Sequence, residues 1–146
     1  MVVNRLLGEQ IIANWEHIKY AAVSANGVDS GVQEYCNGLL INLLCNKYQC
    51  WLGLSDDSSS IIGVAITKMY EDVGSRFYLL IDTVYVYQLT TDFDKQKFLE
   101  VVKKFGEQLD CAGVIFYTDN PKLIKSANQL GFNEIHRVFK ATLGGK

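Results

Sequence analysis

The run from Arg76 to Tyr87, RFYLLIDTVYVY, constrains the fold more than any other part of the chain. It is dense in aromatic and β-branched residues, and Asp82 is its only charged residue after Arg76. Such residues suit a pleated surface that other side chains cover. We interpret the run as a central strand of a sheet, so the rest of the chain must supply neighbouring strands and covering helices.

The residues before this run predict two more strands. Residues 48–54 and 61–70 are apolar segments, and the polar stretch 55–60 between them is rich in Ser and Asp. Two such segments separated by turn residues are typical of a hairpin. A second turn at 71–75 leads into the central strand, so we expect the three strands to form an antiparallel meander.

The residues after the central strand predict a β-α-β unit. Apolar residues recur at helical spacing between about 94 and 110, and GVIFYT at 113–118 is a continuous apolar run. A short apolar run of this kind is typical of a strand that is covered on both faces. The helix supplies the crossover that two parallel strands require.

One more helix and one more strand complete the predicted fold. Asn caps a helix well and Pro suits its first position, so Asn120 and Pro121 predict a helix start. We expect this helix to end at Gly131, because a residue with positive φ commonly follows a helix. Residues 133–143 then alternate as a last strand.

Two amphipathic helices, at about 8–24 and 32–44, precede the meander. The predicted order is helix, helix, three strands, helix, strand, helix, strand. A meander followed by a β-α-β unit requires a mixed central sheet with helices on both faces, which is an α/β fold. The chain has 146 residues, of which 49% are hydrophobic, so we expect residues 1–146 to form a single domain.

Charge and composition argue against several classes of partner. Charged residues make up 21% of the chain and the net charge is -2, so no summed field favours nucleic acid or a membrane surface. No apolar stretch reaches the roughly 20 residues of a bilayer helix, and we find no signal-peptide pattern, so we expect a cytoplasmic protein. The Cys and His residues lack metal-ligand spacing. We therefore expect no metal site and interpret all four Cys as small buried hydrophobes.

The order of elements resembles that of the GNAT family of acyl-CoA-dependent N-acyltransferases over nearly the whole chain. Three local features carry the resemblance: a long strand ending in Tyr85-Val86-Tyr87, Asn120 opening a helix, and Gly131-Phe132 closing it. The resemblance implies acetyl-CoA as the cofactor. It also implies an acyl-CoA N-acyltransferase-like arrangement of the mixed sheet.

The resemblance implies where the coenzyme binds. In this family the fourth strand splays from its neighbour, and its exposed backbone groups hold the pantetheine arm. The matching residues here are Val84, Tyr85, Val86 and Tyr87. Asn120, which opens the helix beyond the next strand, completes this implied set.

The family's phosphate-binding loop departs from its pattern in this chain. The family has Gln or Arg followed by two glycines, and Thr91, Asp94 and Gln96 occupy those places here. Glycine lets a phosphate approach the backbone, whereas an acid repels it. One interpretation is that Thr91 and Gln96 still bind coenzyme, with Lys95 and Lys97 compensating the charge. The other is that Thr91 or the acid after it caps a helix whose dipole the acids complement.

Asp82 is the candidate base. The family usually places a carboxylate on the central strand to take a proton from the attacking amine. Desolvation disfavours the charged form of a lone acid among apolar residues, which suits proton uptake. The alternative is a structural carboxylate that pairs with Arg76 or Lys68, or one that turns toward solvent.

The candidate acid is less well defined. Family members commonly use a Tyr on the last helix to protonate the departing thiolate, and Ala127 stands at that place. Tyr117, near the end of the apolar strand, or Tyr87 could replace it. Each is equally explained as a sheet aromatic whose hydroxyl is satisfied.

These residues support two functional hypotheses. In the first, the chain is an N-acyltransferase, and the amine of a small molecule or a protein attacks the acetyl thioester directly. In the second, it is a non-catalytic GNAT-fold module that binds a protein partner. The segments NWEHIKYAA and Cys50-Trp51 resemble small GNAT-like proteins of tailed phages and prophages, so this partner would belong to a phage virion.

Overall fold

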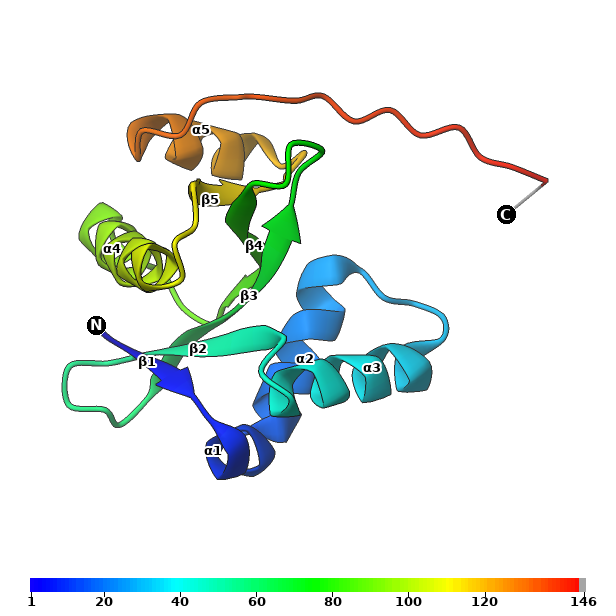
Figure 1. Cartoon of the computed structure of the whole chain (residues 1–146). Helices are drawn as coiled ribbons and strands as arrows, with labels where there is room; N and C mark the ends of the chain where they lie inside the picture. Colours follow the sequence, from blue (N-terminus) through cyan, green and yellow to red (C-terminus); the bar gives the residue numbers. More distant parts are fainter. Residues whose placement is uncertain (145–146) are drawn as a thin grey trace.

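The computed structural model describes residues 1–144, which form one sheet and the helices packed on it (Figure 1). In chain order the elements are β1 (Val2–Leu6), α1 (Gly8–Ala13), α2 (Trp15–Asn26), α3 (Val32–Leu44), β2 (Tyr48–Leu54), β3 (Ile61–Glu71), β4 (Phe77–Val86), α4 (Asp92–Gln108), β5 (Gly113–Phe116) and α5 (Pro121–Gln129). Helices and strands alternate in the second half of the chain, as the sequence predicts.

The sheet has the strand order β1-β2-β3-β4-β5. Each of the first four strands pairs antiparallel with the next, and β4 pairs in parallel with β5. Helix α4 is the crossover between these two parallel strands. The predicted mixed sheet, a meander followed by a β-α-β unit, is therefore confirmed.

Helices cover both faces of the sheet. The first three helices lie on one face, and α4 and α5 lie on the other (Figure 1). Ile18 and Leu43 are fully buried on the first face, and Leu79 and Val102 are fully buried on the second. The central strands thus bury side chains in two cores, which explains their nearly continuous apolar sequence.

The N-terminal part departs from the prediction in two ways. Residues 2–6 form β1, which pairs with β2 and was not predicted, because five residues are too few to show a period. The helix predicted at 8–24 is divided at Asn14. The side-chain amide of Asn14 donates to the carbonyl oxygen of Gln10 at 2.8 Å, and such local bonds compete with the helical ladder.

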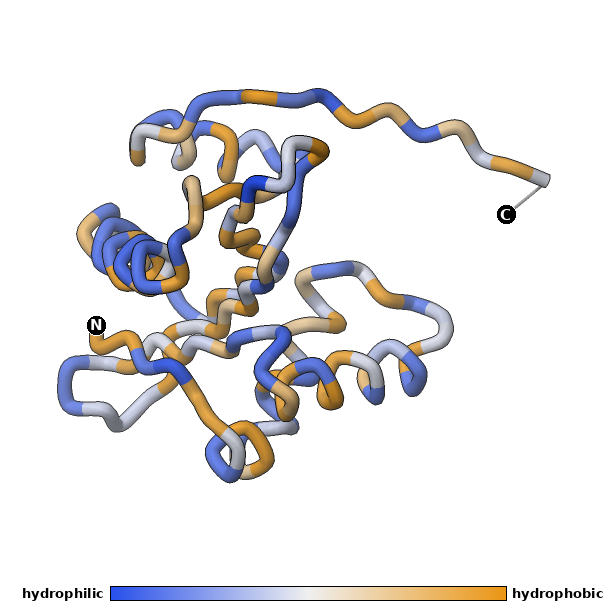
Figure 2. Tube along the Cα trace, viewed as in Figure 1, coloured by the Kyte–Doolittle hydropathy of each residue, from blue (hydrophilic) through white to orange (hydrophobic). Residues whose placement is uncertain are grey.

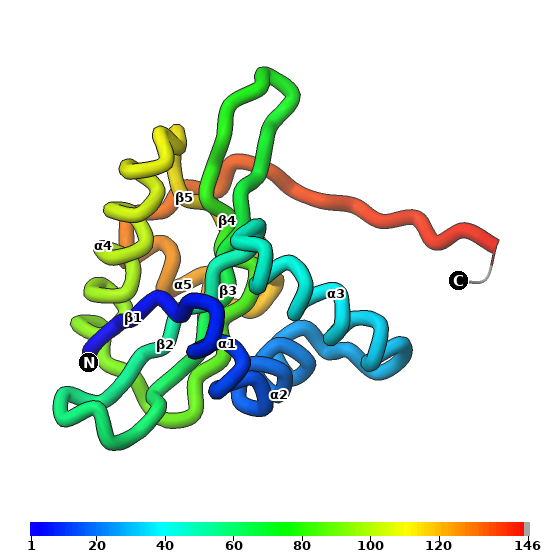
Figure 3. The backbone as a smooth tube through the Cα atoms, turned by 60° about the horizontal axis from the view of Figure 1, so that its bottom comes forward, coloured from blue at the N-terminus to red at the C-terminus, as the bar shows by residue number. Residues whose placement is uncertain are grey.

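Two expectations about the C-terminal part are wrong. Residues 133–143 form no strand, and they run away from the sheet in an extended conformation (Figures 1 and 3). Their alternation suits a sheet, but their own fold brings no strand edge beside them. β5 ends at Phe116, two residues before the predicted end, and it is half-buried because its core contacts come from the α4 face only.

Strands β3 and β4 approach each other closely at Gly63. The register places Gly63 opposite Val86, and a Cβ atom on Gly63 would lie 2.8 Å from the carbonyl oxygen of Tyr85. That distance is shorter than any relaxed carbon–oxygen contact, and the atom it meets belongs to the backbone. Glycine is therefore required here for the course of β4.

We predict that Gly63→Ala lowers the free energy of unfolding by about 1–3 kcal/mol, because the new methyl group must displace the β4 backbone. Gly38→Ala is the matched control. Gly38 lies inside α3 with open space beside its Cα, so alanine there should raise stability by about 0.5–1 kcal/mol. Urea denaturation measures both changes, and a neutral effect at Gly63 would contradict the close approach.

Candidate functional site

Strands β4 and β5 pair over a short distance and then diverge. Their register begins at Tyr78↔Gly113 and ends at Ile81↔Phe116. β4 continues to Val86 and stays paired with β3, whereas β5 ends and the chain turns toward α5. The second half of β4 therefore has a strand neighbour on one side only among residues 1–144.

The divergence leaves β4 backbone groups free of ladder bonds on the β5 side. The N–H of Tyr87 donates to the carbonyl oxygen of Ile62 at 2.8 Å, toward β3. Successive residues of a strand point their N–H and C=O groups to opposite sides, so those of Val84 and Val86 point away from β3. They face the side where β5 has ended. Backbone donors and acceptors in this position need partners, and an extended ligand can provide them.

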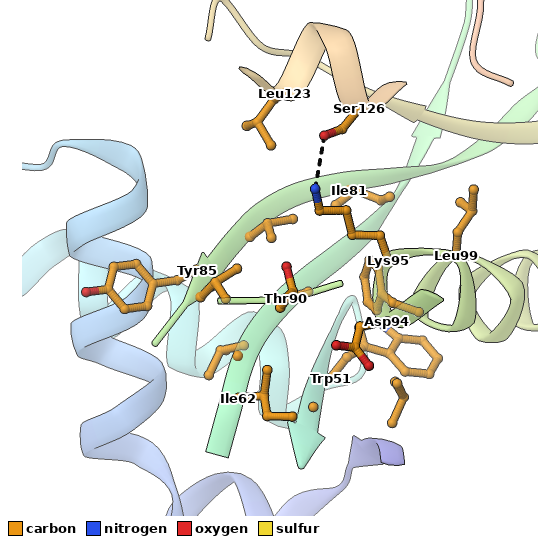
Figure 4. Close-up of a pocket in the computed structure, with 18 of the residues that line it drawn as sticks. Trp51, Ile62, Ile81, Tyr85, Thr90, Asp94, Lys95, Leu99, Leu123 and Ser126 are labelled. Carbon is orange, nitrogen blue, oxygen red and sulfur yellow. Dashed lines mark hydrogen bonds between the residues drawn. The ribbon is translucent and has the colours of Figure 1, made fainter. Parts of the chain in front are cut away.

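A narrow pocket of about 190 Å³ lies beside the divergence, on the face that α4 and α5 cover (Figure 4). Its walls come from all five strands, with β3 and β4 contributing most, and from the facing sides of the two helices. Hydrophobic side chains make up most of the lining, and Thr90, Asp94, Lys95 and Ser126 add polar groups near the helices. Ligand sites are typically apolar clefts with a few placed polar groups. This pocket has room for a slender chain.

Lys95 reaches from α4 to α5 across this pocket. Its ammonium group donates to the hydroxyl oxygen of Ser126 at 3.2 Å (Figure 4). It also lies 3.9 Å from the carboxylate of Asp92, which is an exposed side chain. A half-exposed cation therefore stands at the polar edge of the pocket.

The start of α4 is closed by its own residues. The hydroxyl oxygen of Thr91 accepts from the N–H of Asp94 at 3.1 Å, and the Asp94 carboxylate accepts from the N–H of Thr91 at 3.1 Å. This reciprocal pair is a capping box. The interpretation of Thr91 as a helix cap is confirmed.

Asp82 lies on the opposite face of the sheet, at a β-bulge. The β3–β4 register shifts here, so Asp82 has no partner on β3. Its carboxylate lies 3.6 Å from the ammonium group of Lys68 and accepts from the hydroxyl of Thr83 at 3.1 Å. A third of the side chain, 33%, is exposed. Asp82 is therefore not the desolvated acid that its sequence context suggested, and the alternative pairing with Lys68 is present.

Asn26, at the end of α2, fixes this bulge to the helices. Its side-chain amide lies 2.9 Å from the hydroxyl of Thr83, 2.9 Å from that of Tyr35 and 3.0 Å from the carbonyl oxygen of Ala22. Burial raises the pKa of Tyr35, so its hydroxyl stays protonated at neutral pH. The polar groups around Asp82 are thus held by two helices and one strand.

Tyr117 follows directly after β5. Phe116 packs toward the α4 core, so strand alternation places Tyr117 on the other face, with Asp82. The Tyr117 side chain is 56% exposed. Partial burial and a hydrogen bond with Tyr70 raise the pKa of Tyr117. Ile81 and Phe116 form the last pair of β4 with β5. Asp82 and Tyr117 are the residues that directly follow this pair on the two segments of the chain.

The residues predicted to bind coenzyme fall into two groups. Val84, Tyr85 and Val86 line the pocket, although the Tyr85 ring points toward α2, where it packs edge-on against Tyr20 (Figure 4). The others do not line it: Tyr87, Thr91, Gln96 and Asn120. Tyr87 donates its hydroxyl to the carbonyl oxygen of His17, Asn120 caps α5, and Gln96 is exposed.

Several residues of the pocket were not predicted. Leu123, Ser126, Ala127 and Leu130 form one side of α5 that faces the pocket. Their i, i+3, i+4, i+7 spacing is readable in the sequence as a helix face. What that face contacts depends on where β5 ends, and the sequence does not mark this point.

The four cysteines are free thiols that differ in burial. Cys36 and Cys50 are buried and Cys111 is half-buried, but Cys45 is exposed at the end of α3, so the interpretation of all four as buried is wrong. Burial raises the pKa of Cys50 to about 12.

Among residues 1–144, no three His, Cys, Asp or Glu side chains gather as metal ligands. No helix in the same range is long and apolar enough to cross a membrane.

The fold of this chain is similar to that of several solved acetyltransferase structures. The aminoglycoside N-acetyltransferase AAC(6')-Iy in complex with CoA superposes with a TM-score of 0.75 at 16% identity, over 98% of this chain and 94% of that chain. A predicted acetyltransferase from Clostridium acetobutylicum with acetyl-CoA gives 0.72 at 11% identity, over 97% of both chains. The ribosomal-protein-alanine N-acetyltransferase from Brucella melitensis biovar Abortus 2308 gives 0.70 at 12% identity, over 98% and 100%.

The chain therefore has the GNAT fold, with matches that cover 97–98% of its residues, as the resemblance implied. No family model matches the sequence, and no curated protein matches it. At these low identities the likeness shows the fold, and the function has to be argued from the site.

We predict that thiol reagents label Cys45 rapidly and leave Cys50 unlabelled in the folded protein. At pH 8 a thiol with a pKa of about 12 is almost entirely neutral, and the thiolate is the reactive form. Mass spectrometry after iodoacetamide treatment locates the labels, and Cys45→Ser should remove the fast phase. Labelling of Cys50 at the rate of Cys45 without denaturant would contradict its burial.

Proposed function

We propose that this chain is an acyl-CoA-dependent N-acyltransferase that acts on an amine by direct attack, with acetyl-CoA as the acyl donor. The observation that carries the proposal is the divergence of β4 and β5 beside a narrow apolar pocket. Two of the solved structures with this fold contain CoA or acetyl-CoA, which supports the choice of cofactor.

The pantetheine arm fits the pocket on the α4–α5 face. The arm is slender and carries amide groups, and Val84 and Val86 offer backbone donors and acceptors on the side that β5 leaves open. Bound in this way, the arm takes the place of a strand beside β4. The thioester then lies at the point of divergence, between the pocket and the face that carries Asp82 and Tyr117.

Lys95 compensates for the missing glycine loop. The capping box closes the start of α4, so a phosphate group cannot approach those N–H groups as it would at a glycine-rich turn. The Lys95 ammonium at the edge of the pocket supplies a positive charge instead, and its bond to Ser126 is one that a phosphate oxygen can replace. Lysine binds phosphate as a point charge.

The reaction needs one proton acceptor and one proton donor. Asp82 takes the proton from the acceptor's ammonium group, directly or through water, and the free amine nitrogen attacks the thioester carbon. The C–S bond breaks as the amide forms, and the leaving thiolate takes a proton from Tyr117. The attacking nitrogen gives up its second proton, which returns through water to the Tyr117 phenolate. A raised pKa keeps this phenol protonated at neutral pH. The acceptor is the amine of a small molecule or a protein.

We predict that acetyl-CoA raises the melting temperature of the chain, because a ligand that binds only the folded state stabilises it by mass action. Lys95→Ala should weaken coenzyme affinity about tenfold, the equivalent of about 1.4 kcal/mol, and this loss should shrink at high salt. Lys103→Ala is the matched control, since Lys103 is an exposed lysine of the same helix.

A thermal-shift titration measures this prediction. No shift up to millimolar acetyl-CoA would contradict coenzyme binding and would favour the non-catalytic module, with a protein or virion partner. A shift that Lys95→Ala and Lys103→Ala reduce equally would keep coenzyme binding and remove Lys95 from the site.

We predict that Asp82→Asn lowers turnover by about 100-fold or more and leaves acetyl-CoA affinity unchanged, because it removes a proton acceptor and no coenzyme contact. Asparagine can still accept from the Thr83 hydroxyl, so the bulge should persist. Glu71→Gln, at the exposed end of β3, serves as the control acid. Release of free CoA in the presence of an accepted amine gives the rate. An unaltered rate in Asp82→Asn would exclude Asp82 as the base.

A further inference from the structure

Lys68, on β3, places an amine beside the proposed base. Its ammonium nitrogen lies 3.6 Å from a carboxylate oxygen of Asp82, and 32% of the Lys68 side chain is exposed. β3 changes from mainly hydrophobic to mainly hydrophilic residues toward the hairpin that joins it to β4, and Lys68 belongs to this second part (Figure 2). An acceptor amine has to approach Asp82 in the same way to lose a proton. Lys68 therefore occupies the place that the proposed reaction gives to an acceptor.

The Lys68 ammonium is held from both sides of β3. The register pairs Lys68 with Tyr48 on β2 and with Leu80 on β4. The ammonium lies 5.3 Å from the centre of the Tyr48 ring, which is a cation–π distance, and the Asp82 carboxylate on β4 is its ion-pair partner. The amine is therefore positioned before the coenzyme binds, and such positioning accelerates an attack on a bound group.

Tyr117, the proposed proton donor, lies on the same face as Lys68. A hydrogen bond joins the side chains of Tyr117 and Tyr70. Tyr70 is two residues after Lys68 on β3, and alternate residues of a strand lie on one face. Because β4 lies between β3 and β5 in the sheet, the two tyrosine side chains together span β4. The amine, the base and the acid are thus on one face, where β4 and β5 diverge.

We propose that Lys68 is an acetylation site, and that the chain transfers the acetyl group of acetyl-CoA to the Nζ of its own Lys68. This inference rests on the proposed function, because it uses the same donor, base and acid. Lys68 is half-buried, and β3 is the central strand of the sheet, so the amine of one copy is poorly placed to enter the site of another. The transfer therefore occurs within one chain.

The transfer to Lys68 follows the steps of the proposed reaction. The Lys68 ammonium gives one proton to Asp82, directly or through water, and its nitrogen attacks the thioester carbon. The C–S bond breaks as the new amide bond forms, and Tyr117 gives a proton to the leaving thiolate. The nitrogen loses its second proton, which returns through water to the Tyr117 phenolate, and Asp82 releases its proton to water. The products are free CoA and a neutral acetyl-lysine, so the ion pair with Asp82 is lost.

Lys19 provides an internal control for acetylation that does not need the site. It pairs with a carboxylate as Lys68 does, 3.1 Å from Glu16, and 38% of its side chain is exposed. Lys19 lies in a groove whose walls are α2 and α3, away from the divergence of β4 and β5. Acetyl-CoA that reacts without the site should therefore label Lys19 at least as fast as Lys68.

The first test is to incubate the full chain with acetyl-CoA in a buffer without amines and to locate acetyl groups by mass spectrometry of its peptides. Lys68 should be acetylated at least about tenfold faster than Lys19, because its amine is held beside the base. Free CoA should appear in a burst of one equivalent per chain, with a rate constant that does not change with protein concentration. Equal labelling of the two lysines, or a rate constant that rises with protein concentration, would overturn the proposal.

The second test uses Lys68→Arg to separate this inference from the proposed function. Arginine keeps a positive charge beside Asp82 and Tyr48, but its guanidinium stays protonated and does not attack a thioester. The variant should lose the burst of CoA and should still be stabilised by acetyl-CoA in a thermal-shift titration. A burst that persists in Lys68→Arg would show that Lys68 is not the acceptor.

The two proposals fail in different ways. A chain that binds acetyl-CoA and acetylates an added amine, while its Lys68 stays unlabelled, contradicts this inference alone. A chain that does not bind acetyl-CoA contradicts both this inference and the proposed function.

Discussion

The parallel pairing of β4 with β5 ends at Ile81 and Phe116. The free backbone groups of β4 and the pocket beside them both depend on how short this ladder is. Four residue pairs are enough to fix β5 against the α4 core, while the rest of β4 is held by β3 alone. Because β4 remains an ordered strand beyond its neighbour, its backbone groups keep the geometry of a sheet with no strand to receive them. In the proposed site these backbone groups are positioned before a ligand arrives, and such preorganisation reduces the cost of binding.

Different groups lie on the two faces of the sheet where β4 and β5 diverge. On one face, α4 and α5 enclose an apolar channel with a cation at its edge. On the other face, the bulge turns Asp82 out of the strand's regular alternation, and Asn26 anchors the neighbouring Thr83 to α2. In the proposed reaction the acyl donor enters from the first face and the amine from the second, and the two meet where β4 and β5 diverge.

Much of the fold was predictable, because local rules and tertiary packing agree in most elements. The meander, the β-α-β unit and the Asn120 cap follow from apolar periodicity and capping chemistry. The errors lie where a local pattern is too short or has more than one use. β1 has five residues, Asn14 interrupts a helix by a side-chain bond, and residues 133–143 resemble a strand in sequence but pair with no strand of residues 1–144.

The site was predictable only in part, because its chemistry depends on geometry between distant residues. Val84 and Val86 could be named from the strand that the resemblance aligned, and the structure places them at the pocket. Lys95 and Ser126 lie 31 positions apart in the sequence and on different helices, so no local sequence pattern indicates their contact.

The central claim is that the part of β4 beyond the last β4–β5 pair binds the coenzyme. Nuclear magnetic resonance of the ¹⁵N-labelled chain during titration with CoA tests this claim most directly. The amide signals of Val84 and Val86 should move together and saturate; CoA binding that leaves both unmoved, or no binding at all, would contradict it.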